Sequence, residues 1–86
     1  MGEKIKEPVS VSLLFNHKKR KTSISKIVWK NKVHKIVTHG LRYTFKKGDT
    51  LMQVFSVASE TTNFKLVLDT SSLTWTLEEV YDSSFK

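Results

Sequence analysis

The chain has 86 residues, no cysteine and a formal net charge of +7, and 38% of its residues are hydrophobic. This composition is typical of one small globular domain and differs from that of disordered chains. The absence of cysteine excludes disulfides, thiolate metal sites and cysteine nucleophiles, and it favours a reducing, cytoplasmic setting.

We expect a single domain over residues 1–86, with flexible ends at 1–7 and 83–86. The longest apolar stretch, Val9–Phe15, is interrupted by two serines and is far shorter than the roughly 20 residues of a membrane-spanning helix. It also lacks a small-residue cleavage site. The sequence therefore predicts neither a secretion signal nor a membrane segment.

Charge is distributed unevenly along the chain. Residues 1–48 carry thirteen Lys or Arg against two Glu, whereas residues 49–86 carry two Lys against six acidic residues. Folding either gathers these charges on separate faces or interleaves them, and the sequence leaves both arrangements open.

The first predicted strand is Pro8–Phe15, in which apolar residues alternate with serines at the two-residue period of a half-buried strand. Residues 16–23 are polar and rich in lysine, which predicts an exposed loop. Two stretches rich in β-branched residues, Ile24–Lys30 and Val33–His39, flank Asn31, a residue that tolerates the left-handed backbone of a tight turn. These two stretches should form a hairpin.

Alternation resumes at Leu41–Lys46, and the turn residues Gly48 and Asp49 predict a second hairpin with the following stretch, Leu51–Val57. Leu51–Val57 is apolar on both faces, which favours a central strand covered on two sides.

Two more alternating stretches follow, at residues 63–69 and Leu73–Leu77, and Asp69 begins a turn between them that its side chain can cap. Segment 78–86 is mostly polar, and a short helix, a strand extension and a frayed tail all remain open for it.

Six to seven short strands with regular turn signals, and no helix of three turns, predict an all-β fold. We expect a single small antiparallel β-barrel or a strongly curved sheet, of the SH3-like or OB-like kind.

Three segments, Val28–His34, Phe64–Asp69 and Leu73–Glu79, resemble those of small bacterial β domains of unknown function. The resemblance spans roughly residues 8–82. It implies an all-β fold in a bacterial or phage-like protein, and it implies no chemistry.

The most distinctive local feature is a run of four basic residues in the predicted loop, which could hold phosphates by charge attraction and counterion release. Alternatively, the run is a solvated tip that keeps a strand edge from pairing. Further basic residues are interspersed with aromatic residues up to residue 47, as in barrels that bind single-stranded nucleic acid. The candidate polyanion-binding residues are Lys18, Lys19, Arg20, Lys21, Lys30, Lys32, Lys35, Arg42, Tyr43, Lys46 and Lys47.

Aromatic residues have two possible roles. Trp29 and Trp75 lie at inward positions of the alternation and are expected to pack in the core. Tyr43 fits either the core or a binding face, and we single out Arg42 with Tyr43 as the pair to test first.

The sequence predicts neither an enzyme nor a metal or cofactor site. His34 and His39 would point to opposite faces of a continuous strand, which does not suit shared metal ligation. Glu78 and Glu79 are adjacent and should point apart, with no nucleophile motif near them.

Two functions are therefore open. The first is a non-catalytic module that binds nucleic acid or another polyanion through a basic face. The alternative is a protein interaction or assembly module that uses a strand edge or an apolar patch, such as the predicted outward positions Leu14, Val28 and Val37.

Overall fold

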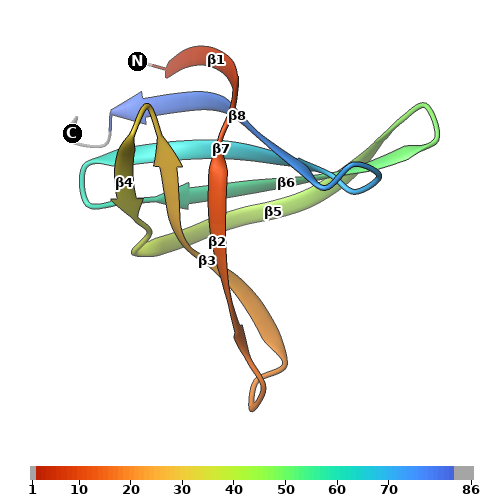
Figure 1. The fold of residues 1–86 in the computed structure, drawn as a ribbon, viewed down its shortest axis with the longest axis horizontal. Coiled ribbons are helices and arrows are strands. Elements are labelled where there is room, and N and C mark those ends of the chain that lie inside the picture. Colours follow the sequence, from red (N-terminus) through yellow and green to blue (C-terminus); the bar gives the residue numbers. More distant parts are fainter. Residues whose placement is uncertain (1, 83–86) are drawn as a thin grey trace.

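The computed structural model describes residues 2–82, which form eight β-strands and no helix (Figure 1). Every strand pair is antiparallel, so the predicted all-β class is confirmed for this part of the chain. None of these residues belongs to a helix that could cross a membrane. The strands are β1 (Gly2–Pro8), β2 (Ser10–Asn16), β3 (Lys21–Trp29), β4 (Lys32–Lys35), β5 (Thr38–Lys47), β6 (Thr50–Ala58), β7 (Thr62–Asp69) and β8 (Thr74–Asp82).

The strands form two sheets. The large sheet has the order β1-β8-β7-β6-β5, and the small sheet has the order β2-β3-β4. In Figure 1 the strands of the small sheet cross those of the large sheet at a steep angle. The edge strands of the large sheet, β1 and β5, are not paired with each other, so the predicted closed barrel is not confirmed.

The chain passes between the sheets at two points. After β1 the Val9 N–H donates to the carbonyl of Trp75 in the large sheet (3.2 Å), and the next residue begins β2 in the small sheet. After β4 the Ile36 N–H donates to Ser25 in the small sheet, and the Val37 N–H donates to Ala58 in the large sheet (2.8 Å). Such switching segments form the corners of orthogonally packed sheets.

Tight turns explain both predicted hairpins. Lys30 and Asn31 have φ values of 54° and 62° between β3 and β4, the left-handed conformation that matches strand twist. Gly48, with a φ of 63°, begins the two-residue turn between β5 and β6. Between β7 and β8, an Asp69 carboxylate oxygen accepts the N–H groups of the two serines that follow Thr70, as predicted.

The core lies between the sheets. The small sheet contributes Ile24 and Ile27, and the large sheet contributes Phe64, Leu66 and Leu77, all at most 2% exposed, together with the buried side chain of Val57. Burying one such side chain is worth about 1.5–3 kcal/mol relative to leaving it in water. This layer therefore holds the two sheets together.

The hairpin of β2 and β3 extends beyond the core. A bulge leaves Ser25 unpaired between Lys26, which faces Ser12, and Ile24, which faces Leu13. The ladder nevertheless continues to Asn16 and Lys21. We call residues 13–23 the arm, and Figure 1 shows it projecting from the body of the molecule.

The ends differ in part from the expectation. The predicted flexible segment 1–7 falls largely in β1, which pairs with β8. A short helix, a strand extension and a frayed tail were all open for segment 78–86. Residues 78–82 form a strand extension, because they complete β8. The predicted flexible end at 83–86 lies outside the described residues.

Candidate nucleic-acid interface

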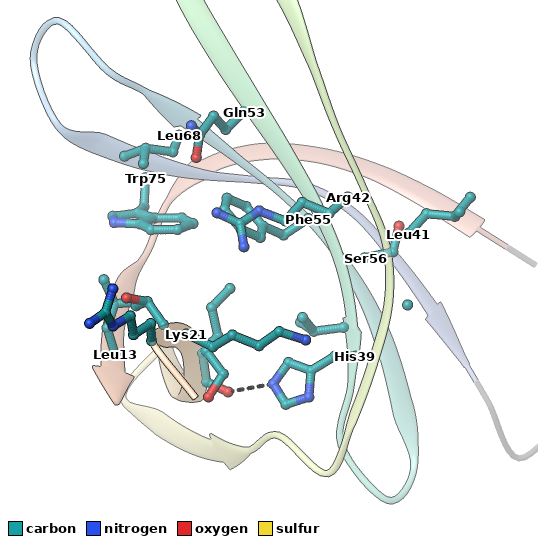
Figure 2. Close-up of a pocket in the computed structure, with 16 residues that line it drawn as sticks. Leu13, Lys21, His39, Leu41, Arg42, Gln53, Phe55, Ser56, Leu68 and Trp75 are labelled. Atoms are coloured by element: carbon teal, nitrogen blue, oxygen red, sulfur yellow. Dashed lines mark hydrogen bonds between the residues drawn. The ribbon is translucent and has the colours of Figure 1, made fainter. Parts of the chain in front are cut away.

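A cleft of about 660 Å³ lies between the arm and the large sheet. The arm and the adjoining Ile24 form one side, and residues from β5, β6, β7 and β8 form the other. Figure 2 draws its 16 lining residues, with Lys21 and Leu13 facing Trp75 and Phe55 across open space. The volume falls within the roughly 300–1,000 Å³ range of small-molecule sites.

Aromatic rings form the wall on the large sheet. The ring centroids of Phe55 and Trp75 are 5.3 Å apart, and the ring planes are inclined by 43°. Both residues are partly buried and pack against the core, whose Ile24 and Val57 also line the cleft. Trp75 was expected to pack in the core, and the structure places it in the lining of the cleft as well.

Arg42 extends across this wall. It is paired with Phe55 in register, so both side chains emerge on the same face of the sheet, and its guanidinium carbon lies 4.7 Å from the centre of the Phe55 ring. This is a cation–π contact, which orients the guanidinium without neutralising its charge.

Arg20 and Lys21 bring two more cations from the arm. The turn before them is fixed locally, because the Asn16 carboxamide oxygen accepts the N–H groups of Lys18 (3.0 Å) and Lys19 (3.1 Å). None of the lining residues is Asp or Glu. The cleft is therefore a site of positive potential with apolar walls, which attracts anions.

A β-bulge makes this arrangement possible. His39 and Arg42 are three residues apart on β5 and would face opposite ways on a regular strand. The register shift between them turns both toward the cleft. The His39 Nε2 atom lies 2.9 Å from the carbonyl oxygen of Ile24; since a carbonyl only accepts, Nε2 carries the hydrogen and ties β5 to the base of the arm.

The eleven predicted site residues do not form one face. Arg20, Lys21 and Arg42 line the cleft, and Lys18 and Lys19 belong to the exposed turn of the arm next to it. The register of β5 is regular from residue 42 onward, so alternation places Lys46 on the same face as Arg42.

The other five residues lie elsewhere. Tyr43 and Lys47 line a depression on the opposite face of the large sheet, so the predicted pair of Arg42 and Tyr43 is split between two faces. Around the turn between β3 and β4, the Nζ atom of Lys30 lies 4.8 Å from the Trp29 ring centre. Lys32 and Lys35 line a separate groove there.

His34 lies in that groove, with its ring centroid 5.1 Å from that of Phe64. Burial, and secondarily the positive charge of Lys32, lowers the pKa of His34 below its ordinary value of 6.5. Within residues 2–82 no three potential metal-ligating side chains of His, Asp or Glu gather.

Comparison with known proteins returned no relative. No protein-family model matches the chain, and neither a curated protein nor a solved structure shows significant similarity to it.

Proposed function

We propose that this protein is a non-catalytic module that binds nucleic acid through the cleft and the arm. The observation that carries the proposal is the lining of the cleft, where Arg20, Lys21 and Arg42 converge with no carboxylate among them. Phosphate groups are the natural ligands of such a site, because guanidinium and ammonium groups release condensed counterions when they bind them.

The arm extends this surface. Lys18 and Lys19 are exposed at the turn of the arm, and the arm projects from the body of the molecule (Figure 1). These basic side chains can therefore reach phosphates that flank the cleft. Contacts of this kind position a nucleic acid without specifying its sequence. The proposal therefore expects salt-sensitive binding with little sequence preference.

The test is a charge-removal variant of the arm, in which Lys18, Lys19, Arg20 and Lys21 are all changed to Ser. Binding of labelled oligonucleotides should weaken, and the slope of log affinity against log salt should fall by about 0.7 for each lost contact to a single strand. The matched control changes Lys30, Lys32, Lys35 and Lys47 to Ser, which removes the same charge away from the cleft. Equal losses in both variants, or no binding by the unaltered protein at low salt, would refute the proposal.

The second candidate function, binding of a protein partner, is favoured by β5. This strand is an edge of the large sheet and all ten of its residues are exposed, with Leu41 76% exposed. An unpaired edge can accept an extended segment of another chain. A protein that sediments as a monomer at high concentration and captures no partner would count against it.

A further inference from the structure

We infer that the cleft holds one unpaired base of a single-stranded nucleic acid, stacked on Trp75, with the adjoining phosphates held by Arg20 and Lys21. The inference rests on the proposed function and deepens it, since it names the form of nucleic acid and the residue that selects it. Phosphate attraction alone would accept single strands and duplexes alike.

Trp75 offers a surface on which a base can stack. Its indole borders the open space of the cleft, while the ring packs against Phe55 and the core behind it (Figure 2). A ring that is supported on one side and open on the other is a rigid platform, and flat bases of any sequence stack on such rings. Phe55 is the poorer platform, because the Arg42 guanidinium already lies over it.

Two side chains of the large sheet lie beside Trp75. Leu68 faces Trp75 in the pairing of β7 with β8, and Gln53 faces Leu68 in the pairing of β6 with β7. Figure 2 shows both next to Trp75 at the same end of the cleft. Leu68 gives the indole apolar support there, and the Gln53 amide offers two donors and an acceptor at the same end.

The arm forms the opposite wall of the cleft. Lys21 and Leu13 from the arm face the aromatic wall, so a base lying on Trp75 would be enclosed between the arm and the large sheet (Figure 2). The two basic side chains of the arm, Arg20 and Lys21, would then contact the charged phosphate backbone of the nucleic acid rather than the stacked ring. In a duplex both faces of every base are already stacked, so only an unpaired base can enter.

The test follows Trp75 directly. In a Trp29→Phe protein Trp75 is the sole tryptophan, and its fluorescence should be quenched by a single-stranded oligonucleotide but not by heparin, which has sulfates and no aromatic rings. Trp75→Leu should weaken single-strand binding by roughly 5- to 150-fold, the range of one base–aromatic stack. Trp75→Phe should lose less, because it keeps a ring. Heparin binding should change little in either variant, and circular dichroism checks separately that both are folded.

The matched control is Tyr43→Leu, which removes an exposed aromatic ring from the opposite face and should leave single-strand affinity unchanged. If duplex and single strand bind equally and Trp75 is not quenched, this inference fails while the proposed function stands. If neither nucleic acid nor heparin binds, or if polyglutamate binds more tightly than any oligonucleotide, both fail. The quenching measurement decides the matter even if Trp75→Leu does not fold.

Discussion

At the scale of single residues, the fold changes the pKa of His34, which the sequence alone does not predict. Its ring lies against Phe64, a core residue 2% exposed, and near the cation of Lys32. Both surroundings disfavour the charged imidazolium, which is why the pKa of His34 is lowered. The folded state therefore binds a proton at this site less readily than the unfolded chain does.

This difference predicts a loss of stability on acidification. The contribution of His34 to the free energy of unfolding is fully present above pH 6.5 and declines as the pH falls from there toward its lowered pKa. Because one proton is involved, the decline cannot exceed about 1.4 kcal/mol per pH unit. Urea unfolding between pH 7.5 and 5.5 should show the decline in the unaltered protein and a flatter profile in His34→Gln. His17→Gln, an exposed position on the arm, should keep the original profile; equal flattening in both variants would contradict the prediction.

The sequence predicted the basic residues of the candidate site but not which of them lie together. Arg20, Lys21 and Arg42 were singled out for their charge and sequence context, and they do line the cleft. Pairing Arg42 with Tyr43 was unsound, because adjacent strand residues point to opposite faces. Whether Arg42 or Tyr43 points into the cleft depends on the pairing of β5 with β6 and on the bulge between His39 and Arg42. The pairing has no signal in β5 itself, whereas Gly40 marks a position where a strand can bulge.

At the scale of elements, the arm is held by its ladder and turn rather than by burial. Phe15 is 61% exposed, although it lies at an inward position of the predicted alternation, and Leu14, a predicted outward position, is 62% exposed. The alternation predicts a strand up to Phe15 and the polar residues 16–23 predict a loop, but the ladder continues into that loop, to Asn16 and Lys21. Residues 21–23 are polar and carry no alternation, so only the pairing itself reveals them as strand.

The exposure of Phe15 predicts that its replacement is nearly neutral. Phe15→Ser should change the free energy of unfolding by no more than about 0.5 kcal/mol, as at other surface positions. Leu66→Ala, at a fully buried position of β7, should cost about 2–5 kcal/mol. Denaturant titration measures both. A large loss for Phe15→Ser would contradict the prediction, and a concentration-dependent midpoint that the substitution abolishes would show that the arm packs against a second copy.

At the scale of the whole molecule, local patterns predicted the all-β class better than the assembly of the strands, and they predicted six to seven strands where the described residues form eight. The all-β class follows from alternation and turn residues, and both hairpins around Asn31 and Gly48 follow from left-handed turn chemistry. The division into two sheets depends on chain crossings at Val9 and at residues 36–37, which have no comparable signal. The cleft could not be foreseen for the same reason, since its two walls come from distant parts of the chain.

The shared core predicts that the two sheets unfold together. Ile27 of the small sheet and Leu77 of the large sheet are both fully buried in one cluster, so neither sheet keeps its apolar face covered without the other. Trp29 reports on the small sheet and Trp75 on the large one, so the single-tryptophan variants Trp75→Phe and Trp29→Phe follow each sheet separately. In each variant, the fluorescence midpoint in urea should coincide with the midpoint from circular dichroism. Adding Ile27→Val should lower stability by about 0.5–1.5 kcal/mol by either tryptophan signal. An earlier transition at Trp29 alone would mean that the small sheet melts independently and that the cleft is open before the protein unfolds.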